Sequence, residues 1–109
     1  MVCDGTGWGE DARIWGFEFL KGNAESFKRL AHLEYLPLPG GDAGSKFPLR
    51  IAYAYGKTLL TEKEWIGTEK IWDRLEPVER KILDQQLDKK VQVFETSSAG
   101  RLFDAVSAL

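Results

Sequence analysis

Cysteine and histidine are each present only once in these 109 residues, as Cys3 and His32. One cysteine excludes a disulfide within the chain, and two possible ligands are too few for a zinc site. A serine or cysteine nucleophile needs a base, and no G-x-S-x-G elbow lies near His32. These absences exclude zinc ribbons and triad hydrolases within the chain, and we expect structural roles for both residues.

A membrane-length apolar run is also missing, and no secretory signal peptide precedes Val2. The 15 basic and 17 acidic residues give a net charge of −2, which argues against non-specific nucleic-acid binding. A hydrophobic content of 43% with 12% aromatic residues is typical of a packed globule. We expect a cytoplasmic protein with no nucleic-acid or membrane partner.

The first third of the chain has the pattern of strands. Apolar and aromatic residues alternate over 12–21, with Ile14, Gly16 and Glu18 on one face. Gly22 and Asn23 then indicate a turn, and residues 26–36 suit a second strand. A short strand ending at residue 4 completes the expected antiparallel sheet. Two prolines and three glycines over 37–45 indicate either an ordered loop or a boundary between sub-structures.

The rest of the chain has the pattern of helices. We expect helices over 49–60, over 62–73 after a Thr61/Glu64 capping box, from Pro77 to about 87, and from about 99 onward. Residues 89–95 should be extended. Expected to be buried are Trp65, Ile66, Ile71 and Trp72, a face with Val78, Ile82, Leu83 and Gln86, and a stripe with Leu102, Val106 and Leu109.

The predicted fold class is therefore α+β, with a small antiparallel sheet followed by about four helices. The 109 residues form one partial domain, divided into a sheet part over 1–36, a loop over 37–48 and a mainly helical part over 49–109.

Three glycines and a threonine hydroxyl separate acidic clusters in the stretch Asp4-Gly5-Thr6-Gly7-Trp8-Gly9-Glu10-Asp11. Glycine lets a backbone turn tightly and approach a ligand closely. A carboxylate beside such a turn at a strand end is well placed to hold a cation that bridges phosphate oxygens. The stretch indicates either a site for a nucleotide or other anion, or an ordinary turn stabilised by Asp4.

A second stretch, Thr96-Ser97-Ser98, comes just before a helical pattern. The free N–H groups and positive dipole end of a helix can hold a phosphate. Ser98 is therefore either part of an anion site or simply the residue that caps the helix.

Several blocks together resemble the HypF family, the carbamoyltransferases of [NiFe]-hydrogenase maturation. The blocks occur in that family's order and cover both ends of the chain, with a poorly matched middle over 58–93. They are Asp4-Gly5-Thr6-Gly7, Ile14-Trp15-Gly16 with Glu18-Phe19-Leu20, Leu38-Pro39-Gly40-Gly41-Asp42, Pro48 and Arg50, Thr96-Ser97-Ser98, and Gly100-Arg101-Leu102-Phe103-Asp104-Ala105. The resemblance places the chain at the centre of the carbamoyl-transfer domain.

The resemblance implies a fragment of an actin/sugar-kinase/Hsp70-like α/β domain. It implies an enzyme that uses carbamoyl phosphate and ATP to form carbamoyl-adenylate, and then carbamoylates the C-terminal cysteine of the partner HypE. The implied cofactors are ATP and a divalent metal ion, iron or zinc, with magnesium accompanying ATP.

By the same resemblance, Asp4 is a ligand of an incomplete metal site. Gly5, Thr6, Gly7, Ser98 and Gly100 are expected to approach the phosphates, and Asp104 is expected to face the nucleotide at its ribose. The family's principal metal-binding histidines lie outside these residues, so we expect no turnover from the chain alone. The catalytic residues and the roles of Glu10, Asp11, Asp42 and Arg50 stay open.

Three positions depart from the family pattern. Phe17 stands where the family has a second glycine. Gln92 and Phe94 stand where it has an asparagine and a proline, which puts a polar contact from position 92 in doubt. The alternative hypothesis is a non-catalytic protein-binding or scaffold module, which would use an aromatic sheet face made of Trp8, Trp15, Phe17, Phe19, Phe27 and Tyr35.

Overall fold

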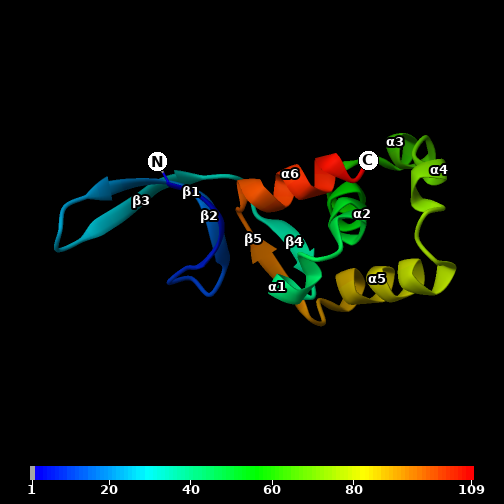
Figure 1. The fold of residues 1–109 in the computed structure, drawn as a ribbon, viewed down its shortest axis with the longest axis horizontal. Helices are drawn as coiled ribbons and strands as arrows, with labels where there is room; N and C mark the ends of the chain where they lie inside the picture. The colour runs from blue at the N-terminus through cyan, green and yellow to red at the C-terminus, as the bar shows by residue number, and fades with distance from the viewer. Residues whose placement is uncertain (1) are drawn as a thin grey trace.

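The structure is a computed structural model that describes residues 2–109, with the side chains of 7–41 and 43–109. The molecule is elongated, with principal extents of 50 × 24 × 22 Å. Two strands project as an arm at one end, and the helices gather at the other (Figure 1). The elements in chain order are β1 (Val2–Trp8), β2 (Ile14–Gly22), β3 (Phe27–His32), β4 (Leu36–Pro39), α1 (Gly41–Gly44), α2 (Pro48–Leu59), α3 (Glu62–Ile66), α4 (Glu69–Trp72), α5 (Pro77–Lys89), β5 (Val93–Thr96) and α6 (Ala99–Ser107).

The strands form one mixed sheet in the order β1-β2-β5-β4, with β3 pairing to β2 as well. The pairs β1–β2 and β2–β3 are antiparallel, as expected for the head of the chain. The pair β4–β5, which was not predicted, is also antiparallel. The pair β2–β5 is parallel and joins Ile14 to Thr96, residues 82 positions apart. This junction connects the N-terminal arm to the helical body.

The predicted alternation of β2 is confirmed, and its buried face is the one that carries Ile14, Gly16 and Glu18. The opposite face, with Phe17 and Phe19, is half-buried to exposed, and the two rings contact edge to face. A charged residue therefore lies on the buried side of the central strand.

The core surrounds α2, whose residues 51–55 are all buried. Trp65 and Trp72 stack with ring centroids 5.2 Å apart, and Tyr53 contacts both rings edge-on. Other buried residues come from β4, from the segment between α4 and α5, from α5 and from α6: Leu38, Leu75, Leu83 and Ala105. The α+β class predicted from the sequence is confirmed.

The helix expected over 62–73 is divided into α3 and α4 at Gly67 and Thr68. The Thr68 hydroxyl donates to the Trp65 carbonyl at 2.7 Å and accepts from Trp72 Nε1 at 2.8 Å. A threonine hydroxyl that bonds locally in this way competes with the helical ladder. The Thr61/Glu64 capping box is confirmed, but the burial of Ile66 is wrong, because that side chain is 65% exposed.

The structure also differs from the loop expected over 37–48, whereas the extended segment expected over 89–95 is confirmed in part by β5. Leu38 is fully buried, and β4 pairs with β5 through Leu38 and Phe94. The backbone of Gly40 and Gly41 then adopts positive φ angles of 75° and 55°, which glycine tolerates and which start the single turn of α1. The prolines and glycines over 37–45 therefore belong to β4 and to the turn that follows it, and they do not form a long loop.

The buried faces of the last two long helices were predicted only in part. Leu83 of α5 is buried, but Val78 and Ile82 are exposed. On α6, Leu102 packs on the core and Ala105 is buried, whereas Val106 is exposed, as is Leu109 beyond the end of the helix. Each helix buries only a narrow face against the rest of the molecule. The row of apolar residues in its sequence is therefore wider than the face that is buried.

We predict that Ile51→Ala destabilises the fold strongly, whereas Ile66→Ala does not. Ile51 is 0% exposed, and removing a buried isoleucine to alanine costs about 2–5 kcal/mol. The matched change at exposed Ile66 should stay within about 0.5 kcal/mol. Urea unfolding of both variants measures the difference, and equal losses would contradict the assignment of the core.

Candidate functional site

The two glycine- and serine-containing stretches lie next to each other in the fold. Helix α6 lies beside both β1 and β2. The Ser97 amide and the Thr96 hydroxyl each donate to the Ile14 carbonyl at 3.0 Å, so the turn before α6 is attached to the start of β2. The sheet thus brings the residues around Asp4 and those around Ser98 to one region.

The Asp4–Gly7 stretch lies within a strand, which corrects the expectation that the strand ends at residue 4 and is followed by a turn. Cys3 pairs with Phe17 and Gly7 with Trp15, so β1 advances four residues while β2 advances two. The stretch between them is a bulge, a feature that re-aims side chains beside functional sites. The side chains of Asp4 and Thr6 lie outside the described ones, and their predicted roles stay predictions.

The start of α6 is built by short hydrogen bonds. The Ser98 hydroxyl accepts from the Arg101 amide at 3.2 Å, and the Ser98 amide donates to the Thr96 hydroxyl at 3.1 Å. Ser98 is therefore a helix cap, whatever else it binds. Gly100 lies in the first turn of α6, and no acidic residue there compensates the positive end of the helix dipole.

Asp104 lies on the second turn of α6 and pairs with Arg101 at 3.1 Å. Arg101 is mostly buried, and its Nε has no hydrogen-bond partner among the described residues. An ionised carboxylate has about four acceptor sites. The ion pair with Arg101 therefore leaves Asp104 able to accept a further hydrogen bond from a hydroxyl group. Its predicted contact with a nucleotide is not tested by this geometry.

The sequence interpretation missed the role of Glu18, which is 2% exposed. Its Oε1 accepts from the Ser97 hydroxyl and from the Gly16 amide, the latter at 3.4 Å, and its Oε2 lies 3.4 Å from Arg29 Nη1. A buried carboxylate is costly unless it is paired and hydrogen-bonded, and Glu18 has both kinds of partner. The available signal was a charged residue on the Ile14 face of an alternating strand.

Asp11 belongs to the structural network at the base of the arm. Its carboxylate accepts from Tyr35 at 2.6 Å, from Trp15 Nε1 at 2.8 Å and from Arg29 at 2.9 Å. The Arg29 guanidinium also lies 4.2 Å from the centre of the Trp15 ring, within the range of a cation–π contact. The left-handed residue Ala12, with φ of 59°, turns the chain between these partners. Asp11 therefore stabilises the link between β2 and β3.

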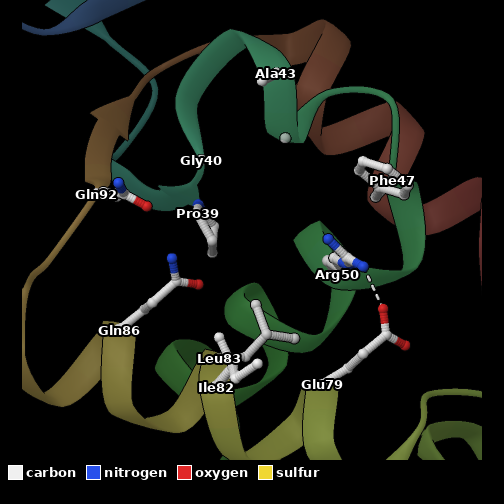
Figure 2. Close-up of a pocket in the computed structure, with 11 residues that line it drawn as sticks. Pro39, Gly40, Ala43, Phe47, Arg50, Glu79, Ile82, Leu83, Gln86 and Gln92 are labelled. Carbon is white, nitrogen blue, oxygen red and sulfur yellow. Dashed lines mark hydrogen bonds and ion pairs between the residues drawn. The ribbon is translucent and has the colours of Figure 1, made fainter.

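A separate cavity of about 260 Å³ lies at the far end of β5, between α1, α2 and α5 (Figure 2). Arg50, whose role the sequence left open, forms an ion pair there with Glu79 and covers the Phe47 ring at 4.2 Å. Arg50 thus joins α2 to α5. The side chain of Asp42 lies outside the described ones, and Gln92 lines this cavity.

No group of three His, Cys, Asp or Glu side chains that could hold a metal ion occurs among the described residues. Asp4, the predicted metal ligand, is not among the side chains described. In the part of the chain that the structure covers, no helix has the length and apolar character to cross a membrane.

All 109 residues match one family model, the second subdomain of the Kae1-like domain of carbamoyltransferases, and the chain belongs to that family. It is 40% identical over 109 residues to the carbamoyltransferase HypF of Rhodobacter capsulatus, and 38% identical to the probable carbamoyltransferase HypF of Methanocaldococcus jannaschii. These matches cover 99% and 100% of this chain. The chain spans 14% of the length of each relative.

A crystal structure of full-length HypF in the phosphate- and nucleotide-bound form has a similar fold, with a TM-score of 0.86 and 36% identity. It matches 99% of this chain, which spans 14% of that protein. The resemblance to HypF noted in the sequence is therefore confirmed along the whole chain, including the middle where the motifs are sparse.

We predict that Asp11 gives the fold a pH-dependent stability. Desolvation raises the pKa of Asp11, but hydrogen bonds from Tyr35, Trp15 and Arg29 lower it by a larger amount. The pKa of Asp11 therefore falls from 3.8 to about 2. Because the folded pKa is depressed, the stabilisation is complete above pH 4 and is lost as the pH falls toward 2.

Asp11→Asn should therefore lower the unfolding free energy at pH 7 and approach the wild type near pH 2. Urea unfolding across this range is the measurement, with Asp88→Asn on exposed Asp88 as the matched control. A constant difference between wild type and Asp11→Asn at all pH values would refute the role of the ionised carboxylate.

Proposed function

We propose that this chain forms one wall of the carbamoyl-transfer site of a HypF-type carbamoyltransferase. The reaction uses carbamoyl phosphate and ATP to form carbamoyl-adenylate, and the carbamoyl group then passes to the C-terminal cysteine of HypE. The observation that carries the proposal is that β1, which contains the bulge, lies against α6, while the turn before α6 is bonded to Ile14, in a chain that matches the family along its full length.

The start of α6 is the proposed phosphate-binding wall. First-turn N–H groups of a helix have no partner within the helix, and the dipole places about half a positive charge there. Gly100 has no side chain that would obstruct the approach of a phosphate to its amide, and Arg101 adds a positive charge. Ser98 and Gly100 then contact phosphate oxygens, and Asp104 accepts a hydrogen bond from a ribose hydroxyl of the nucleotide.

The bulge of β1 is the proposed opposite side of the same site. Gly5 and Gly7 allow a close approach of the backbone to the phosphates, and the Thr6 hydroxyl supplies a donor. Asp4 is the carboxylate ligand of a divalent metal, iron or zinc, and magnesium accompanies ATP. A hard or borderline cation held there would supply charge stabilisation to the phosphate oxygens. The remaining metal ligands are expected from outside these residues.

The proposed active unit is larger than this chain, which spans 14% of its relatives, and we expect no turnover from the 109 residues alone. The predicted cytoplasmic location stays a prediction. The scaffold alternative has weaker support, since Trp15 and Tyr35 of the proposed aromatic face are used within the Asp11 network. Trp8, Phe19 and Phe27 are exposed and are the residues that such a partner would contact.

A chimaeric enzyme tests the proposal. The 109 residues replace the matching segment of the Rhodobacter capsulatus carbamoyltransferase HypF, and carbamoylation of HypE is measured with ATP and carbamoyl phosphate. We expect activity within about tenfold of the parent enzyme. Asp4→Ala should reduce it by about 100-fold or more, because several kcal/mol of charge stabilisation depend on the metal.

Asp88→Ala, at an exposed position near the end of α5, is the matched control and should leave activity unchanged. A folded chimaera without activity would refute the proposed function. Full activity of the Asp4→Ala chimaera would contradict the proposal that Asp4 is a metal ligand.

A further inference from the structure

Glu18 connects three parts of the chain that are distant in sequence. Its carboxylate accepts from Ser97 in the turn before α6, from Gly16 on its own strand, and from Arg29 on β3. Ser97 is 1% exposed, so this contact is shielded from water. Hydrogen bonds to an ionised acceptor in such surroundings are stronger and more directional than neutral ones.

Ser97 determines how the chain enters α6. Its amide is held by the Ile14 carbonyl at 3.0 Å, and its hydroxyl is held by Glu18. The next residue, Ser98, is the helix cap, and the Leu102 amide donates to its carbonyl at 3.2 Å. With both the main chain and the side chain of Ser97 tied to β2, the direction of the first-turn N–H groups is fixed relative to the sheet.

Arg29 holds Glu18 from the other side. One guanidinium nitrogen lies 3.4 Å from Glu18 and donates to the Tyr35 hydroxyl at 2.5 Å, and the other donates to Asp11 at 2.9 Å. The cation compensates the buried carboxylate, and the Asp11 network keeps the cation in place. Hydrogen bonds therefore run continuously from the arm to the start of α6.

We propose that Glu18 is a positioning residue for the phosphate-binding end of α6, and that it acts by holding the Ser97 hydroxyl. This inference rests on the proposed function, since the ligand is the phosphate of a bound nucleotide. Glu18 does not touch the ligand. It sets the place of Ser98 and Gly100, as a supporting residue does when it restricts the geometry of a binding group.

Glu18→Gln separates this role from general stability. A carboxylate accepts from Ser97 and from Arg29 at the same time, but an amide presents only one oxygen. If that oxygen faces Ser97, the amide NH₂ opposes Arg29, and if it faces Arg29, the contact with Ser97 is reversed. In both orientations a neutral hydrogen bond, weaker than the charge-assisted one, holds the Ser97 hydroxyl. Arg29 keeps Asp11 and Tyr35 as partners in either case, so the variant should remain folded.

The first experiment needs no ligand. Amide hydrogen exchange of the 109-residue chain is compared for wild type, Glu18→Gln and Ser97→Ala. We expect exchange about tenfold faster at Arg101 and Leu102, whose amides depend on Ser98, and little change at Tyr55 in α2. Glu95→Gln, which removes an exposed carboxylate two residues from Ser97, is the matched control and should match the wild type.

The second experiment measures KM for ATP and kcat in the chimaeric enzyme. Glu18→Gln and Ser97→Ala should each raise KM for ATP by about tenfold, and the double variant should be no worse than either, because all three weaken or remove the same contact between Glu18 and Ser97. A purely structural role would instead lower active enzyme and kcat while leaving KM for ATP unchanged.

The outcomes distinguish this inference from the proposed function. If the unmodified chimaera is inactive, the proposed function and this inference both fail. If it is active and both variants retain the wild-type KM and exchange pattern, only the positioning role of Glu18 fails. Equal acceleration of exchange at Tyr55 and Arg101 would also overturn it, since that result indicates general loss of stability.

Discussion

The buried contact of Glu18 with Ser97 is the constraint on which the arrangement of this chain depends. A glutamate at the centre of a sheet costs stability unless its oxygens are used, and here the oxygens join the arm, the central strand and the start of α6. The parallel pairing of Ile14 with Thr96 places the partners within reach. Without that pairing, the two stretches proposed to hold a nucleotide would belong to separate parts of the molecule.

The two ends of the molecule are stabilised by different interactions. The helical body has an aromatic core around Tyr53, Trp65 and Trp72, and so it can keep α2 and α6 in fixed positions. The arm formed by β2 and β3 extends away from the helical body in Figure 1, and β3 has no buried side chain. The polar network of Asp11, Arg29 and Tyr35 stabilises its base. Its exposed apolar residues, Phe19, Phe27 and Leu30, are a surface that a larger protein can cover.

Much of the fold could be predicted from the sequence because its signals are local. The alternation of β2, the proline at the start of α2 and the Thr61/Glu64 capping box each depend on neighbouring residues, and all three are present in the structure. The pairing of β5 with β2 could not be predicted, since Ile14 and Thr96 interact across the fold and no local pattern encodes this. The same reason hid the role of Glu18. The convergence of the two stretches followed only from the family resemblance, and the break at Thr68 depended on a tertiary position for Trp72.

A two-dimensional amide NMR titration of this chain with ATP and magnesium tests the central claim most directly. If the β1 bulge and the start of α6 form one nucleotide wall, shifts should be confined to residues 4–9 and 97–104 and should saturate together. No shifts, or shifts centred on the cavity beside Arg50 and Gln92, would contradict the account.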